Sequence, residues 1–88
     1  MQVKILGKVW RLKFLPITSV RGDCDPPNKR GKLIRISTSL VGEERLEVLV
    51  HEMLHAAGWH IDEEFVRRFS EDVARELWKL GYRMGGVD

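Results

Sequence analysis

The stretch that most constrains the fold is residues 43–58, EERLEVLVHEMLHAAG, in which apolar side chains recur every three or four positions. This spacing is that of an α-helix with one apolar face, and two glutamates open its first turn, where carboxylates interact favourably with the helix dipole. Gly58 stands where glycine commonly follows a helix end. A helix with one apolar face must bury that face against another element. The stretch therefore predicts a helix of about four turns that packs on a partner.

A second helical pattern runs from about Asp62 to about Leu80. Asp62 suits the N-cap, because its carboxylate accepts a hydrogen bond from a free N–H group of the first turn. Gly81 is placed to end the helix. The apolar positions of the pattern are Val66, Phe69, Val73, Leu77 and Leu80. The C-terminal half thus predicts two consecutive helices.

The N-terminal half has the patterns of strands. Apolar and basic residues alternate over residues 3–15 with Gly7 between them, which predicts one bent strand or a hairpin. Residues 21–31, RGDCDPPNKRG, are rich in turn formers and predict a loop. Residues 32–38, KLIRIST, alternate again and predict another strand. We therefore expect a small α+β fold, with an antiparallel sheet of two to three strands followed by two helices that pack against one of its faces.

Charge is unevenly distributed along the chain, although its total is small. The 88 residues include 15 basic and 13 acidic side chains, for a net charge of +2, which is too weak a bias to argue for nucleic acid. Nine of the cations precede the first glutamate, with only two aspartates among them. We interpret these cations as a solvated strand face and keep an anionic partner as the alternative.

Length and composition favour a single domain over residues 1–88. No uninterrupted apolar run reaches the length of a signal-peptide core or a membrane span, so no membrane partner is expected. Cys24 is the single cysteine and cannot form an internal disulfide, which favours a reducing compartment. We therefore expect a cytoplasmic protein.

Residues 51–55, HEMLH, form an H-E-x-x-H motif inside the first predicted helix, which is the context that this motif requires. At about 100° per residue, His51 and His55 leave a helix on the same side, one turn apart, so both imidazoles can bind one ion. Glu52 lies about 100° round the helix from His51, where it is a poor ligand for that ion but can reach water beside it. The motif predicts one zinc ion, with Glu52 as the general base.

Zinc held by three protein ligands keeps a fourth position open, lowers the pKa of water there to about 7 and polarises a carbonyl under attack. Glu52 would take the proton of the water and pass it to the leaving amine. Burying two imidazoles without partners would cost about 1–3 kcal/mol each, which argues for a metal site and against histidines that occur on the helix by chance. We therefore expect a zinc-dependent peptidase. The alternative is a non-catalytic, zinc-stabilised protein-binding module.

The third zinc ligand has several candidates. In the extended pattern H-E-x-x-H-x-x-G-x-x-H, a glycine reverses the chain so that a later histidine reaches the metal. Gly58 is present, and we take His60 as the third ligand, although it comes one residue earlier than the pattern requires. An acid at the start of the second helix is the other solution, and the alternatives are Glu63, Glu64 and Asp62.

These residues resemble the zincin metallopeptidases, and the short layout resembles the minimal SprT-like or ImmA-like peptidases of phages and prophages. The resemblance covers roughly residues 32–77, from the last predicted strand through the H-E-x-x-H helix to the second helix. It implies peptide hydrolysis with zinc at His51 and His55 and with Glu52 as the base. In zincins the strand before the active-site helix is commonly a sheet edge that binds an extended peptide by β-augmentation. By resemblance, that role falls on residues 32–38.

Overall fold

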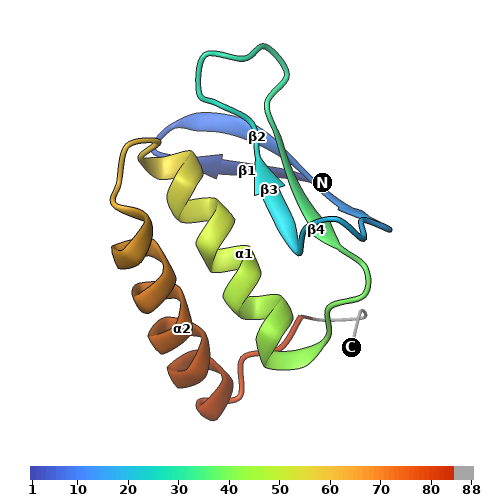
Figure 1. Cartoon of the computed structure of the whole chain (residues 1–88), viewed down its shortest axis with the longest axis vertical. Coiled ribbons are helices and arrows are strands. Elements are labelled where there is room, and N and C mark those ends of the chain that lie inside the picture. Colours follow the sequence, from blue (N-terminus) through green and yellow to red (C-terminus); the bar gives the residue numbers. More distant parts are fainter. Residues whose placement is uncertain (85–88) are drawn as a thin grey trace.

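The computed structural model describes residues 1–84 and places a small sheet beside two long helices (Figure 1). The elements in chain order are β1 (Gln2–Ile5), β2 (Lys8–Leu15), β3 (Gly22–Cys24), β4 (Leu33–Ser37), α1 (Gly42–Ala57) and α2 (Glu63–Lys79). The predicted α+β class is confirmed. Both helices lie where the spacing predicts them: α1 ends before Gly58, and Asp62 caps α2 by accepting a hydrogen bond from the Phe65 N–H.

The sheet has four strands in the order β1-β2-β4-β3. β1 and β2 form an antiparallel hairpin, β4 runs parallel to β2, and β3 runs antiparallel to β4. The sheet therefore differs from the prediction in two details, its fourth strand and its one parallel pair. The strand missed by the prediction is β3, whose three residues inside the polar segment 21–31 are too short to show alternation. The direction of β4 depends on the path of the chain between residues 16 and 32, and alternation carries no information about direction.

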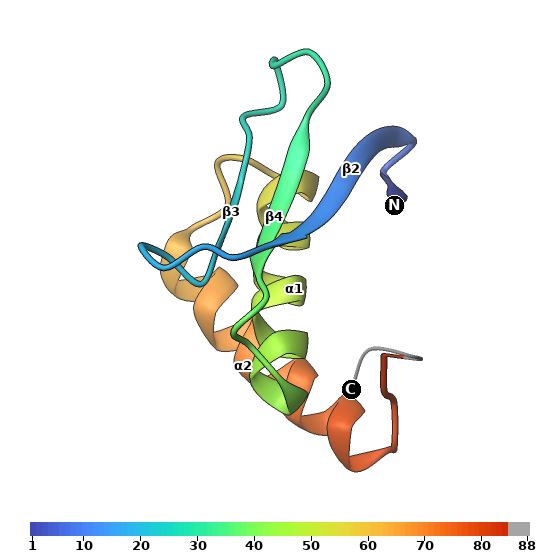
Figure 2. The same cartoon turned by 90° about the vertical axis from the view of Figure 1, so that its right-hand side faces the viewer.

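The hydrophobic core lies between α1 and one face of the sheet. Its most buried members are Trp10, Leu12, Ile34, Ile36, Leu40 and Val48. Along β2 the buried positions alternate with exposed ones, because successive side chains of a strand point to opposite faces. Burial of each large apolar side chain contributes about 1.5–3 kcal/mol. Both helices lie on the same side of the sheet (Figures 1 and 2), so its opposite face has no helix over it.

The second helix packs on the first and not on the sheet. α2 runs alongside α1, and no strand lies against it within residues 1–84 (Figure 1). The expectation that both helices pack on the sheet therefore holds for α1 alone. Ser70 and Ala74 are fully buried on α2, and these small side chains allow the two helices to approach closely. No helix in this part of the chain is both long and apolar enough to cross a membrane.

Candidate metal centre

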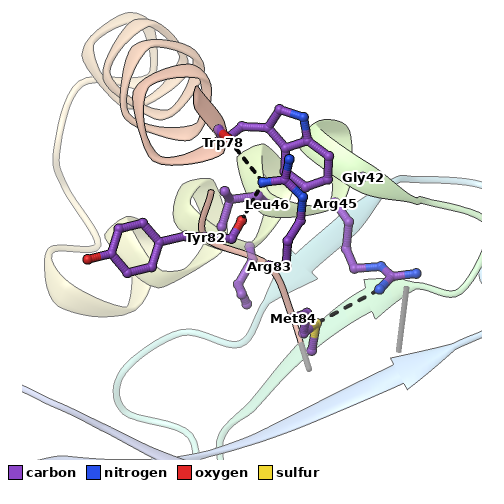
Figure 3. Close-up of a pocket in the computed structure, with 8 residues that line it drawn as sticks. Gly42, Arg45, Leu46, Trp78, Tyr82, Arg83 and Met84 are labelled. Carbon is purple, nitrogen blue, oxygen red and sulfur yellow. Dashed lines mark hydrogen bonds between the residues drawn. The ribbon is translucent and has the colours of Figure 1, made fainter. Parts of the chain in front are cut away.

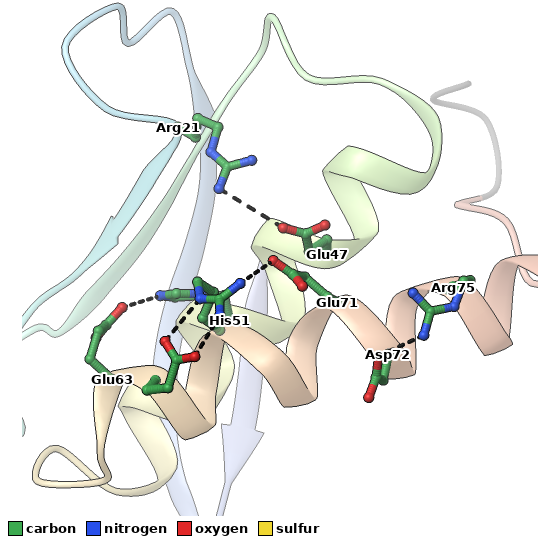
Figure 4. Close-up of polar contacts among 9 residues, drawn as sticks. Arg21, Glu47, His51, Glu63, Glu71, Asp72 and Arg75 are labelled. Atoms are coloured by element: carbon green, nitrogen blue, oxygen red, sulfur yellow. Dashed lines mark hydrogen bonds and ion pairs between the residues drawn. The ribbon is translucent and has the colours of Figure 1, made fainter.

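His51, His55 and Glu63 come together where the second half of α1 meets the start of α2. The two imidazoles leave α1 one turn apart, with their ring centroids separated by 4.9 Å. Glu63 is the first residue of α2, and its Oε1 lies 3.0 Å from His51 Nε2 (Figure 4). Its Oε2 lies 3.0 Å from His55 Nε2. One carboxylate therefore contacts both histidines.

The donor atoms of this cluster fit one zinc ion. Two histidines and a glutamate are a donor set that zinc accepts, and two ligands of a tetrahedral zinc lie roughly 3.3 Å apart. The donor atoms here all lie within 4.8 Å of one another. Burial, together with the nearby His55 and Arg21, lowers the pKa of His51 although the Glu63 carboxylate acts in the opposite direction; a lowered pKa favours the neutral imidazole, which is the form that binds metal. The Glu63 side chain is 68 % exposed, which leaves the cluster open on one side to water or a substrate.

His60, which we expected as the third ligand, is not part of the cluster. It is exposed in the turn between the two helices. In that turn the Ile61 N–H donates a hydrogen bond to the Gly58 carbonyl at 3.0 Å, and Ile61 packs over Gly58, where an added Cβ would lie 2.6 Å from it. This tight turn turns Ile61 inward and leaves His60 facing solvent. Instead, the histidines contact Glu63, which is one of the alternatives from the sequence.

The two other acids considered as ligands have different partners. Asp62 Oδ2 accepts the Phe65 N–H at 3.0 Å and caps α2. Glu64 Oε1 lies 2.6 Å from Arg67 Nη2. A rotation of about 100° per residue separates Glu64 from Glu63 on the helix, so only one of the two acids can face α1.

Glu52 lies beside the cluster and is only 7 % exposed. Burial, reinforced by the carboxylates of Asp23 and Glu63, raises the pKa of Glu52 to about 7. A carboxyl group that titrates near neutral pH is suited to accept a proton and return it. Glu52 borders a cavity of about 490 Å³ whose other lining residues are Gly22, Asp23, Cys24, His51, His55, Trp59 and Glu63. The predicted general base and the three candidate ligands therefore face one shared space.

Gly22 allows β3 to lie directly against α1 at this cavity. A Cβ added to Gly22 would lie 2.9 Å from both the Arg35 carbonyl oxygen and Val48 Cγ1, and 3.4 Å from Glu52 Cγ. Any larger residue would have to push α1 away from the sheet. Glycine at this position thus sets the distance between the edge strand and the Glu52 side chain.

The strand expected to bind a peptide is not a sheet edge. β4 is paired with β2 on one side and with β3 on the other, so its backbone groups are already used in the ladders. The free edge next to α1 belongs to β3, which contacts the helix directly. Residues 32–38 therefore do not offer the open edge that β-augmentation requires.

Three residues near the centre were not expected there from the sequence: Arg21, Asp23 and Cys24. Arg21 Nη2 lies 3.9 Å from Glu47 Oε2 (Figure 4), and its Nη1 lies 3.2 Å from Glu44 Oε2. Burial, followed by the Glu52 charge, raises the pKa of the Cys24 thiol to about 12, so the thiol stays protonated. Their position depends on the pairing of β3 with β4, and nothing in the residue pattern of the segment 21–31 indicated that pairing.

A second cavity, of about 210 Å³, lies at the other end of α1 (Figure 3). Its lining residues are Gly42, Arg45, Leu46, Leu49, Trp78, Tyr82, Arg83 and Met84. The Arg83 guanidinium stacks 3.3 Å from the centre of the Trp78 ring and donates a hydrogen bond to the Trp78 carbonyl at 3.0 Å. None of the candidate metal ligands borders this cavity, so it is separate from the site.

Comparison of the chain with protein-family models, with curated proteins and with solved structures found no match. The geometry of the site brings together two imidazoles one turn apart on α1, an exposed carboxylate that contacts both, and a buried carboxyl group next to them. Such a set suits the binding of one divalent metal and a proton transfer beside it.

Proposed function

We propose that this protein is a zinc-dependent peptidase that holds one ion with His51, His55 and Glu63 and uses Glu52 as its general base. The observation that carries the proposal is the placement of both Glu63 carboxylate oxygens 3.0 Å from the two imidazole Nε2 atoms, in the cavity that Glu52 also borders. Metal ligands and a proton acceptor are the two parts that hydrolysis of an amide by water requires.

Each residue has a defined task in this proposal. Zinc at such a site supplies Lewis acidity, which acidifies water and polarises a carbonyl group. Glu52, with a pKa of about 7, takes the proton of the attacking water and gives it to the leaving nitrogen. Neutral His51 offers its Nε2 lone pair, and exposed Glu63 leaves one side of the site open.

The substrate in this proposal is an extended peptide that pairs with the free edge of β3. Gly22 and Cys24 of β3 border the same cavity as the histidines and Glu52, so a chain added to that edge passes the candidate ligands. The compartment in this proposal is the cytoplasm, because the one cysteine of the chain, Cys24, has no second cysteine for an internal disulfide.

A second function has one observation in its favour. Glu63 belongs to α2 while His51 and His55 belong to α1, so an ion held by all three would also cross-link the two helices. In a chain of 88 residues such a cross-link adds stability that a small core supplies only in part. The alternative is therefore a non-catalytic, zinc-stabilised protein-binding module.

The substitution Glu52→Gln separates the two functions. We expect the wild type to retain about one zinc per chain and to cleave members of a mixed peptide library, with cleavage detected by mass spectrometry. The variant should retain the zinc and lose about 10²–10⁴-fold in rate. His60→Ala, the matched control, should change neither zinc content nor cleavage. A zinc-loaded wild type that cleaves no peptide would favour the binding module, and a wild type without zinc would exclude both functions.

A further inference from the structure

The face of the sheet opposite α1 carries a row of exposed cations. Paired residues of neighbouring strands point to the same face, and the register pairs Gln2 with Arg11 and Lys13 with Arg35. Lys4, Arg11 and Lys13 are exposed, whereas the residues between them on β2, such as Leu12, point into the core. The row therefore lies on the side of the sheet that neither helix covers (Figure 2).

These cations have no acidic partners among the residues that the structure describes. Within residues 1–84, Lys4, Arg11 and Lys13 take part in no ion pair and no side-chain hydrogen bond to an acid. Arg35, the next cation on this face, differs because its guanidinium lies 2.9 Å from Asp23 and 3.0 Å from Asp25. Three neighbouring charges of one sign on a sheet repel one another, so folding alone gives no reason to gather them there.

Three of the four cations of α2 show the opposite arrangement. Arg67 pairs with Glu64 and Glu71, Arg75 with Asp72, and Lys79 with Glu76: every one of these contacts lies within one helical turn. The difference extends to the whole chain. Residues 1–40 contain nine cationic and two acidic side chains, whereas residues 41–88 contain six cationic and eleven acidic ones. The positive charge is therefore concentrated in the half of the chain that forms the sheet, and acids outnumber cations in the half that forms the helices.

We propose that this open sheet face, defined by Lys4, Arg11 and Lys13, binds nucleic acid through the phosphate backbone. Cations two residues apart on a strand lie about 6.6 Å apart, close to twice the rise of about 3.4 Å per phosphate along one nucleic-acid strand. The residues that the register places on this face include no aromatic side chain, so the face has no aromatic ring on which a base could stack. Binding is therefore independent of base sequence and strongly dependent on salt.

The same features distinguish nucleic acid from an anionic membrane. Peripheral membrane surfaces combine cations with aromatic or large apolar side chains that enter the lipid interface. The exposed large apolar side chains nearest this row are Val9, at 48 %, and Leu6 in the turn between β1 and β2, at 80 %. Neither is aromatic, so the face offers ion pairing to phosphates without an aromatic anchor. It is also separate from the metal centre, because α1 and the histidines lie on the other side of the sheet.

The test measures the fluorescence anisotropy of labelled oligonucleotides of about 20 nucleotides, single-stranded and duplex, with the whole chain at about 50 mM salt. We expect saturable binding that weakens as salt is added. The logarithm of the affinity, plotted against the logarithm of the salt concentration, should have a slope of about −2 for single strands or about −3 for a duplex, because three cations contact phosphates. The triple substitution of Lys4, Arg11 and Lys13 by Gln should weaken binding by about tenfold or more.

The matched control is the triple substitution of Arg67, Arg75 and Lys79 by Gln, which removes the same charge from α2. This control variant should bind the oligonucleotides with an affinity within about twofold of that of the wild type. Circular dichroism of both variants checks that they fold. Equal losses in the two variants would show an effect of net charge alone and overturn the proposal. So would the absence of binding to either oligonucleotide, or stronger binding to phosphatidylserine vesicles or polyglutamate than to nucleic acid.

Discussion

Glu63 Oε1 lies 3.0 Å from His51 Nε2, and this contact joins the first residue of α2 to the second half of α1. The same carboxylate reaches His55 Nε2 at 3.0 Å with its other oxygen. The geometry of the candidate site therefore depends on how the two helices pack, and the turn between them fixes that packing. Substitutions at Glu63 should consequently affect metal binding more than substitutions at the third histidine.

Removal of the charge at Glu63 should weaken zinc binding. Glu63→Gln keeps the shape of the side chain but replaces an anionic oxygen donor with a neutral amide, so we expect at least about tenfold lower zinc affinity. Competition with a chromophoric chelator measures the zinc affinity. Glu64→Gln is the control, since Glu64 contacts Arg67 instead of the histidines. Equal affinity of the wild type and Glu63→Gln would remove Glu63 from the ligand set.

The buried carboxyl group of Glu52 should make the metal-free protein less stable as the pH rises. Burial and the neighbouring carboxylates raise its pKa from the ordinary value of 4.5 to about 7. The folded state thus binds the proton more tightly than the unfolded state, so the stabilisation is complete below pH 4.5 and is lost as the pH rises through about 7. Glu52→Gln should therefore stabilise the metal-free protein at alkaline pH by about 2 kcal/mol and change little in acid.

Urea unfolding of the metal-free wild type and Glu52→Gln, each measured on both sides of this pH range, tests the prediction. Glu47→Gln serves as the control, because that carboxylate lies earlier on the same helix and is partly exposed beside Arg21. A stability difference between wild type and Glu52→Gln that does not vary with pH would contradict the assignment of this titration to Glu52.

Gly22→Ala should disturb both the fold and the site. The added Cβ would lie 2.9 Å from the Arg35 carbonyl oxygen and from Val48 Cγ1, so α1 or β3 must move. We expect a loss of about 1–3 kcal/mol in the free energy of unfolding, as for other overpacked positions. Gly31→Ala is a useful comparison, because a Cβ there has nothing within 4 Å and only its φ of +63° is unfavourable. Equal costs at the two positions would show that contact with α1 is not the cause.

The parts of the structure that the sequence predicts are those determined by local residue patterns. The spacing of His51 and His55 on one helix places both imidazoles together whatever the rest of the fold, and Asp62 marks the start of α2 through its own hydrogen bond. Local patterns carry no information about which acid of α2 faces α1. That choice depends on the Gly58–Ile61 turn and on the packing of the two helices, which places Glu63 at the histidines and His60 in solvent.

The sheet shows the same limit of prediction from local residue patterns. Alternation identifies β2 and β4, but their parallel pairing and the short edge strand β3 depend on contacts between distant residues. Those contacts bring Asp23 and Cys24 to the cavity beside Glu52. The segment 21–31 was predicted to be a loop from its turn-forming residues, and three of those residues form a strand because β4 supplies a partner for them.

Asp25 should be the carboxylate that stabilises this segment. It is 6 % exposed, its Oδ2 accepts the Leu33 N–H at 3.0 Å, and its Oδ1 lies 3.0 Å from Arg35 Nη2. Burial alone would raise the pKa of Asp25, but the hydrogen bonds from Leu33 and Arg35, together with the charges of Arg35 and Lys29, lower it below the ordinary value of 3.8. The folded state therefore favours the ionised form, so the stabilisation is present above pH 3.8 and is lost as the pH falls through the lowered pKa.

Asp25→Asn should accordingly cost about 1–3 kcal/mol at neutral pH, because the neutral amide leaves the half-buried Arg35 guanidinium without one of its two charged partners. The cost should shrink in strong acid, where the wild-type carboxylate is itself protonated. Asp23→Asn is the matched control: its side chain is 50 % exposed and contacts the same arginine, so we expect a loss of no more than about 1 kcal/mol. Chemical unfolding of the three proteins measures both costs, and a larger loss at Asp23 than at Asp25 would show that the exposed pair, not the buried one, holds β3 to β4.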